Sequence, residues 1–422
     1  MTSEKKRVPA WIIVVYIAVM TVGFMFGSWT TPWWVRHVAQ VFVIGLGFLW
    51  LLIRADFQNI CFSGKFVAAF GIPFMGILMI STIYWLQDFQ DIVYITRGFS
   101  TILYHVISLL SMCAAVYLFG DRAVEYTLIA MILANLTTVA EAIYYYGAGE
   151  LVTGLIELAK TGGADTTPVT KVLEIHDLTF AFGLMLIYYL FFTKGKKRIM
   201  GLIPGIIFFL IGYKRIAALG LLGACITYLL LVWQNDTWKK RTLQIITLVG
   251  VIFCFFYVYM IHSGLFDRIV AYFEIDTMGR SELYDLFRPL YEFSPGFRGH
   301  GIGYVTRYCA VLVEEGVGVF RNYGYSGLHN DILTLYMELG FTGFLFWVWY
   351  TLRTRIMWAL KKLHMDAALA LVCGTVYMFV TYATDNTFFY CYVTTIYMLL
   401  PMALEVKHLE VENERGKSGN KS

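Results

Sequence analysis

Twelve apolar runs, most of them about 17 to 25 residues long, follow one another along this sequence. A helix of that length crosses the hydrocarbon core of a bilayer. Hydrophobic residues make up 59% of the 422-residue chain, against about 45 to 50% in soluble proteins. We therefore predict an all-α integral membrane protein with about twelve transmembrane helices, in a single polytopic domain that covers residues 1–422. The runs are 11–27, 33–53, 66–86, 99–119, 124–146, 178–193, 199–213, 215–233, 242–263, 330–352, 366–384 and 388–405.

Two details of these runs affect the count. The seventh run is short and holds Pro204, so the seventh and eighth runs are open to an alternative reading as one broken hairpin. The first run follows Lys5, Lys6 and Arg7, and no small-residue cleavage pattern comes after it. We therefore expect a first span rather than a cleavable signal.

The basic residues between the runs predict the orientation, because Lys and Arg concentrate in cytoplasmic loops. With the N-terminus inside, both termini are cytoplasmic and the long segment 264–329, between helices 9 and 10, is an extracytoplasmic loop. We expect the cytoplasmic tail 406–422 to be disordered, since its last part is polar. The basic groups placed inside are Lys5 to Arg7, Lys194 to Arg198, Lys239 to Arg241, Arg353 with Arg355, and Lys361 with Lys362.

The shorter outer segment and the cysteines lead to two further predictions. The outer segment 147–177 carries Val152, Leu155, Ile156 and Ala159 at helical spacing, which predicts an interfacial helix. The seven cysteines include no CxxC motif and no pair outside the predicted spans. Neither a disulfide framework nor a zinc site is therefore predicted.

The long loop carries six arginines, no lysine and eight carboxylates, which is unusual in so apolar a chain. In it, Arg280 precedes Ser281, which is a candidate N-cap for a helix of apolar spacing. Arg280 would then lie beside a helix N-terminus, where backbone N–H groups also favour an anion. The alternative is that Arg280 only forms an ion pair with Glu282 or Asp285.

A second candidate anion site is the pair Lys214 and Arg215, which stands between two apolar runs at the outer boundary. An anionic lipid headgroup would lie at this depth, and a guanidinium can bind phosphate oxygens bidentately. The alternative is a turn whose basic side chains extend towards water.

A third candidate is His329, which is followed by Asn330 and Asp331 at the start of the tenth run. An imidazole at the membrane surface can accept a proton from a hydroxyl near neutral pH. Either Asn330 or Asp331 is expected to cap the helix, and the alternative for His329 is an ordinary interfacial residue. The nearby run 299–303 is expected to be a flexible turn with exposed backbone and not a dinucleotide site, since no strand and helix flank it.

Four short motifs in this order resemble the O-antigen polymerase and ligase superfamily of bacterial membrane glycosyltransferases. The resemblance covers roughly residues 200–350, and one departure is Lys214, where the family often has serine. The motifs are Lys214-Arg215-Ile216-Ala217-Ala218-Leu219, Gly279-Arg280 with Leu283-Tyr284, Gly299-His300-Gly301-Ile302-Gly303, and His329-Asn330-Asp331-Ile332-Leu333 with Glu338-Leu339-Gly340-Phe341-Thr342-Gly343.

The resemblance implies a metal-independent membrane glycosyltransferase without a cofactor, in the bacterial cytoplasmic membrane, with its active site on the extracytoplasmic side. Its donor would be an undecaprenyl-diphosphate-linked oligosaccharide and its acceptor a glycan hydroxyl. Arg215 and Arg280, with Lys214 as a further contact, would hold the diphosphate. His329 would be the catalytic residue, and Asn330 and Asp331 would lie at the acceptor or behind it.

Three functions remain open on the sequence alone. A polysaccharide polymerase of the cell envelope would extend a lipid-linked chain, with a flippase and a chain-length regulator as partners. An O-antigen ligase would move the glycan to lipid A core or another acceptor. A lipid-linked glycan flippase or transporter is the alternative of another class, and no nucleic-acid partner is expected. The predicted spans hold few charges, which favours chemistry at the surface over translocation.

Overall fold

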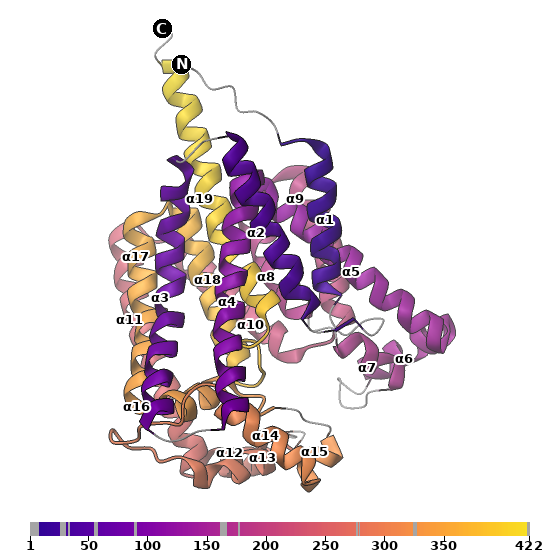
Figure 1. The fold of residues 1–422 in the computed structure, drawn as a ribbon, viewed down its shortest axis with the longest axis vertical. Coiled ribbons are helices and arrows are strands. Elements are labelled where there is room, and N and C mark those ends of the chain that lie inside the picture. Colours follow the sequence, from indigo (N-terminus) through magenta and orange to yellow (C-terminus); the bar gives the residue numbers. More distant parts are fainter. Residues whose placement is uncertain are drawn as a thin grey trace.

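The structure is a computed structural model that describes residues 8–25, 31–32, 34–54, 58–87, 91–160, 167–175, 178–275, 277, 279–323 and 327–419. In this described part the secondary structure is helical throughout, without strands. Long helices form a bundle, and the short helices α12 to α15 cover one end of it (Figure 1). Helix α19 runs away from that end, towards the end at which α1 begins (Figure 1).

Each of the twelve predicted runs falls on a helix of the bundle. By length and composition, seven helical stretches are suited to cross a membrane, and α1 and α8 are shorter apolar helices. The predicted class, an all-α membrane protein, is confirmed, whereas this criterion does not establish twelve crossings. The helices are α1 Ala10–Phe24, α2 Val35–Arg54, α3 Gln58–Gln87, α4 Ile92–Phe119, α5 Ala123–Tyr146, α8 Leu178–Phe191, α9 Gly195–Ile211, α10 Arg215–Val232, α11 Asp236–His262, α16 Asp331–Trp349, α18 Met365–Tyr382 and α19 Cys391–Gly419.

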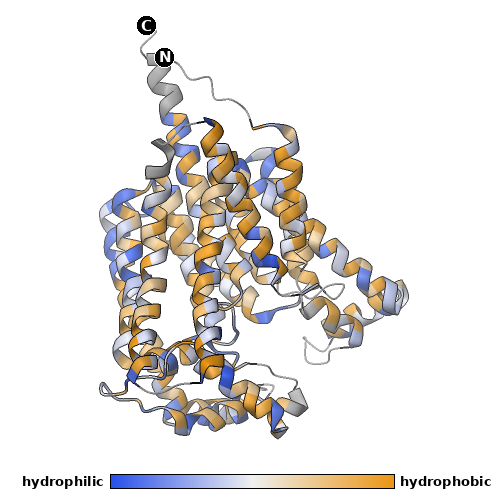
Figure 2. Cartoon of the chain, in the orientation of Figure 1, coloured by the Kyte–Doolittle hydropathy of each residue, from blue (hydrophilic) through white to orange (hydrophobic). Residues whose placement is uncertain are grey.

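The outward faces of these helices carry many large apolar side chains, and the bundle is accordingly mostly orange in Figure 2. A soluble protein rarely exposes so much contiguous apolar surface, whereas lipid tails cover such a surface without cost. The hydropathy of the surface therefore agrees with the membrane assignment. Examples are Leu49, Met79, Ile203, Leu222 and Ile252.

Two helix ends differ from the expectation. The tenth run does not end before Arg353, because its helix continues through the π-helical turn η4 (Tyr350–Thr354) into α17 (Arg355–Lys362). Arg355, expected in a cytoplasmic loop, is only 4% exposed inside the bundle.

The tail expected to be disordered continues α19 as a helix to Gly419. A helix that is already formed needs only propagation, which costs far less than a new nucleus.

The segment after α5 forms α6 (Ala148–Lys160) and α7 (Pro168–Ile175), so the helix predicted there is present. Leu151 and Leu158 are buried, whereas Val152 and Ile156 are exposed. One face of α6 therefore packs on the protein, and the apolar opposite face suits contact with a membrane interface.

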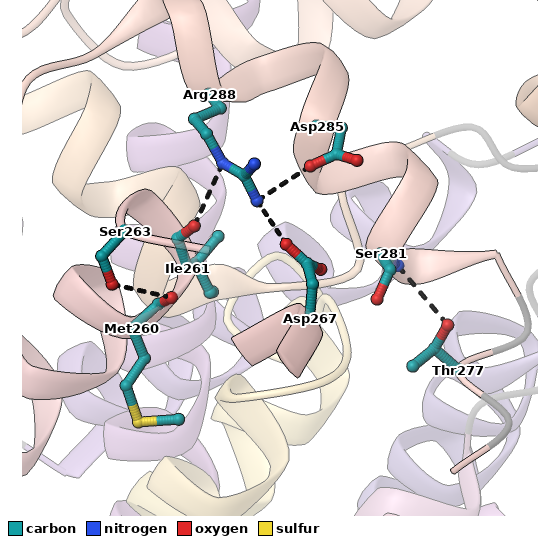
Figure 3. Close-up of polar contacts among 8 residues, drawn as sticks. All are labelled: Met260, Ile261, Ser263, Asp267, Thr277, Ser281, Asp285 and Arg288. Atoms are coloured by element: carbon teal, nitrogen blue, oxygen red, sulfur yellow. Dashed lines mark hydrogen bonds and ion pairs between the residues drawn. The ribbon is translucent and has the colours of Figure 1, made fainter. Parts of the chain in front are cut away.

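The described part of the long loop folds into short helices that cover one end of the bundle. Its elements are α12 (Leu265–Tyr272), α13 (Arg280–Phe287), η3 (Arg288–Leu290), α14 (Tyr304–Glu314) and α15 (Gly318–Tyr323). The guanidinium of Arg288 joins three of these parts, as Figure 3 shows. It lies 2.5 Å from Asp267 and 2.8 Å from Asp285, and its Nε donates to the carbonyl of Ile261 at 3.2 Å.

The glycine-rich run 299–303 differs from the flexible, exposed turn that we predicted. The N–H groups of His300 and Gly301 donate to the carbonyls of Met337 and Glu338 at 3.1 and 2.7 Å. They reach these carbonyls because α16 breaks at Gly340, where φ is 66° and ψ is −179°. A Cβ at Gly340 would lie 2.1 Å from the carbonyl oxygen of Arg298, so no larger residue fits. The glycines permit close approach of two backbones instead of flexibility.

The same run is fixed to three helices of the bundle. Glu338 Oε1 accepts from the N–H groups of Gly303 and Val305, at 3.0 Å each, and so caps α14. Ser81 Oγ, on α3, accepts from Ile302 N–H at 3.0 Å. A Cβ at Gly98, on α4, would lie 2.0 Å from the carbonyl oxygen of Ile302. The run 299–303 is thus held against α3, α4 and α16.

Candidate functional site

Four segments that are far apart in the sequence meet at the end of the bundle that carries the loop. They contribute Lys214 just before α10, Arg280 at the start of α13, His329 just before α16, and Asp385 between α18 and α19. Asp385 joins them: its carboxylate lies 3.6 Å from His329 Nδ1 and within the electrostatic influence of Lys214. Tyr284, on α13, is influenced by the charges of both Arg280 and Asp385.

Asp385 is a buried carboxylate with several donors around it. Its Oδ1 accepts from the N–H of Asn386 at 2.8 Å and from the hydroxyl of Tyr390 at 3.2 Å. Burial by itself would raise the pKa of the Asp385 carboxyl, but His329 and the positive charge of Lys214 hold that pKa well below its usual value. Asp385 is therefore ionised at neutral pH and faces the imidazole as an anion.

His329 adopts a backbone conformation that is costly for a side-chain-bearing residue. Its φ is 50°, in the left-handed region, which costs about 1 to 3 kcal/mol. Its neighbours impose this geometry, because Leu328 is buried and Asn330 caps α16. The Nδ1 side of the imidazole faces Asp385 at 3.6 Å. The side chain is 22% exposed, so a ligand can still reach it.

Asn330 and Asp331 both hold the backbone near His329. Asn330 is the cap of α16: its Oδ1 accepts from Leu333 N–H at 3.0 Å, and its Nδ2 donates to the Tyr257 hydroxyl at 3.3 Å. Asp331 is fully buried, and its Oδ2 accepts from Phe388 N–H at 2.6 Å. The structure therefore places Asp385, rather than Asp331, against the imidazole.

Arg280 is the first residue of α13, which agrees with its predicted position at a helix N-terminus. The predicted cap is wrong by two residues: Gly279, with φ at 83°, is the N-cap, and Ser281 lies inside the helix. A left-handed N-cap needs glycine more than it needs a hydroxyl.

The ion pairs expected as an alternative for Arg280 are absent from the described part of the chain, where no carboxylate lies within 4 Å of its nitrogens. Asp285 binds Arg288 instead, at 2.8 Å. The Nε of Arg280 is buried and has no hydrogen-bond partner among the described residues. A buried N–H donor on a cation without a protein partner suits an anionic ligand.

Lys214 and Arg215 differ in exposure, since Lys214 is partly buried and Arg215 is exposed. The Nζ of Lys214 lies 5.8 Å from the ring centre of Phe180, and its charge reaches Asp385. Arg215 is the first residue of α10, and its side chain is exposed. Lys214 and His329 thus both lie close enough to Asp385 to act on its charge, and Arg280 acts on the neighbouring Tyr284, whereas Arg215 is exposed on the first turn of α10.

Sequence reasoning missed Asp385. It stands in a three-residue gap between the last two predicted runs, on the side to which the long loop was assigned. A lone carboxylate at that boundary was the only available signal. Among the described residues, no group of three or more His, Cys, Asp or Glu side chains could hold a metal ion.

The pKa of Asp385 leads to a stability prediction. Because the folded pKa lies below the unfolded value near about 3.9, the stabilisation is fully present above that value and is lost as the pH falls through the folded pKa. We expect Asp385→Asn to lower the free energy of unfolding by about 1 to 3 kcal/mol at pH 7. Thermal unfolding of the detergent-purified protein between pH 7 and pH 3 measures this, and the difference from wild type should shrink below pH 4 or so.

The matched control for this measurement is Asp236→Asn, at the exposed N-terminus of α11. It should change the unfolding temperature little at any pH. An Asp385→Asn protein as stable as wild type at pH 7 would contradict the assigned ionisation.

The arrangement combines two abilities. Arg280 and Lys214 can bind an anion, and the His329 and Asp385 pair can take a proton from a hydroxyl while its orientation is fixed.

Comparisons with known proteins agree with the motifs. Residues 200–348, about a third of the chain, match the family described as O-antigen ligase. No curated protein and no solved structure matches the chain. The matched segment contains Lys214, Arg280 and His329, whereas Asp385 lies beyond its end. The predicted resemblance to the O-antigen polymerase and ligase superfamily is confirmed for this segment.

Proposed function

We propose, from the O-antigen ligase domain at residues 200–348, that this membrane protein is a polysaccharide polymerase. It would transfer a glycan from an undecaprenyl-diphosphate donor to a sugar hydroxyl of a lipid-linked acceptor. The observation that carries the proposal is the convergence of Arg280 and Lys214 with the His329 and Asp385 pair at one end of the bundle.

The cations act on the leaving group. When the bond between the anomeric carbon and the diphosphate breaks, negative charge collects on phosphate oxygens. Arg280 and Lys214 stabilise this charge more strongly in the transition state than in the ground state, which lowers the barrier. We expect Arg215, which is exposed on the first turn of α10, to bind the same diphosphate.

The imidazole acts on the acceptor. With Nδ1–H donated towards Asp385, the Nε2 of His329 is the basic nitrogen and accepts the proton of the attacking hydroxyl. The hydroxyl oxygen forms the new bond to the anomeric carbon, and the lipid diphosphate departs with the electron pair of the broken bond. Asp385 is a positioning residue that also stabilises the imidazolium formed in this step.

We assign the site to the outer face of the bacterial cytoplasmic membrane, with twelve crossings and both termini inside. The distribution of Lys and Arg supports this orientation. The path of the chain supports it as well, since α1 begins and α19 ends at the end of the bundle that lies opposite the loop (Figure 1).

The test is a reaction of the purified protein in detergent with a lipid-diphosphate oligosaccharide. A polymerase yields lipid-linked glycans of increasing length, and we expect the activity to persist in EDTA. A ligase yields product only after lipid A core or another acceptor is added. If neither product forms while the lipid crosses the bilayer of proteoliposomes, the protein is a transporter and the proposal fails.

A further inference from the structure

A further cation, Arg355, lies buried inside the bundle. It follows the π-helical turn η4 and is 4% exposed. The rings of Phe70 and Tyr397 flank its guanidinium, with centres 4.9 and 5.3 Å away. In the described part of the chain, no carboxylate lies within 4 Å of its nitrogens. The interior thus holds a full positive charge without an anionic side chain beside it.

Tyr397 does not supply the missing charge. Arg355 Nη2 donates to its hydroxyl at 2.7 Å, and this hydroxyl lies 2.6 Å from Thr375 Oγ1. Thr375 already donates its own proton to the carbonyl of Leu371 at 2.7 Å. The proton between the two hydroxyls therefore belongs to Tyr397, which is a neutral phenol.

Two threonines beside Arg355 have hydroxyls without a partner. Neither Thr351 Oγ1 nor Thr394 Oγ1 has a hydrogen bond to any described residue, although both are buried. The Nε of Arg355 is in the same condition. Buried helix threonines elsewhere in this chain donate to the carbonyl one turn earlier. Examples are Thr127 to Ala123, Thr193 to Tyr189, Thr227 to Gly223, and Thr247 to Leu243.

The three residues that carry these groups line one cavity of about 20 Å³, together with Trp347, Tyr382 and Phe388. Its volume is comparable with one water molecule or one monatomic ion, and a phosphate or a sugar does not fit. A guanidinium keeps its charge in proteins, so burial without a counterion is costly. A water molecule would use the donors but leave the charge uncompensated. An anion can accept a hydrogen bond from the Nε of Arg355 and from both hydroxyls, and it also compensates the charge.

We propose that this cavity is the binding site of a single monatomic anion of the size of chloride. Arg355 Nε and the hydroxyls of Thr351 and Thr394 donate to it. The anion neutralises the buried guanidinium and stabilises the π-helical turn, a feature often found at functional sites. None of its three donors takes part in the proposed glycan transfer, although Phe388 in the cavity wall also donates its N–H to Asp331.

The test measures the unfolding temperature of the full chain, purified in detergent and exchanged into gluconate, as sodium chloride or bromide replaces gluconate at constant ionic strength. We expect a saturable rise with halide concentration, because a ligand that binds only the folded state stabilises it. Thr351→Val and Thr394→Val each remove one donor without changing the shape. Each should raise the half-saturating halide concentration about tenfold or more, the effect of one lost hydrogen bond to a charge.

The matched control is Thr247→Val on α11, a buried helix threonine whose hydroxyl donates to Leu243 O at 2.7 Å and which does not line the cavity. Its half-saturating concentration should equal that of wild type. Arg355→Gln should abolish the halide response, and the two valine variants carry the test if that protein does not fold. A wild-type unfolding temperature independent of halide, or equal shifts in Thr394→Val and Thr247→Val, overturns the proposal.

Discussion

Arg280→Ala is expected to lower the turnover of the purified protein by about two to three orders of magnitude. Arg280 lies at the start of α13, with a buried Nε that has no partner in the described part of the chain. Its loss removes charge stabilisation that the diphosphate needs as it leaves. The measurement is the rate of glycan elongation on a lipid-diphosphate donor, at matched amounts of folded protein.

Arg307→Ala is the control for this change. Arg307 is also an arginine of the outer loop, but its guanidinium pairs with Asp91 at 3.2 Å and is partly exposed. An exposed ion pair contributes little, so this variant should stay within a few-fold of wild type. Arg215→Ala belongs in the same series, and a loss as large as that of Arg280→Ala would assign Arg215 to the phosphate site as well. Near-normal elongation by both the Arg280 and the Arg215 variants would remove the proposed mechanism.

His329→Ala is expected to lower turnover by about 10² to 10⁴. The imidazole of His329 lies 3.6 Å from Asp385. The residue has a strained, left-handed backbone conformation just before the start of α16. In the proposed mechanism, its loss removes the group that accepts the proton of the acceptor hydroxyl. Steady-state kinetics should show the loss in kcat, with a smaller change in KM for the donor, because the cations that bind the diphosphate remain.

His408→Ala is a suitable control, since His408 lies on α19 far from the loop and pairs with Glu412 at 3.1 Å. It should leave kcat unchanged. Full activity of the His329→Ala protein across the neutral pH range would mean that another group takes the proton.

The long helices could be predicted because hydrophobic runs of this length have one common solution, a helix that satisfies its own backbone. The loop could not be predicted in the same way. Glycines such as Gly299 and Gly301 suit a flexible turn and a tight backbone contact equally well, and only the break at Gly340 decides between them. The cap of α13 was misplaced for a similar reason, since Ser281 fits the usual pattern and the left-handed Gly279 does not.

At the candidate site, the motifs pointed to the residues that lie next to helix starts: Lys214, Arg280 and His329. Asp385 escaped, because its role depends on a contact with His329 across more than fifty residues of chain, and nothing in its local sequence marks that contact. Arg355 was assigned to a loop because a charge after an apolar run usually ends the span. Its burial depends on a π-helical turn and on rings from two other helices.

The contacts of the loop with helices outside residues 200–348 limit how a chimera of this protein can be designed. The segment that matches the O-antigen ligase family ends at residue 348. Its glycine run nevertheless contacts Ser81 and Gly98, and the imidazole of His329 lies 3.6 Å from Asp385. A fragment of residues 200–348 would lack Ser81 and Gly98, which contact the glycine run, and Asp385, which faces the imidazole. A functional chimera must therefore carry α3, α4 and the α18–α19 corner from the same parent.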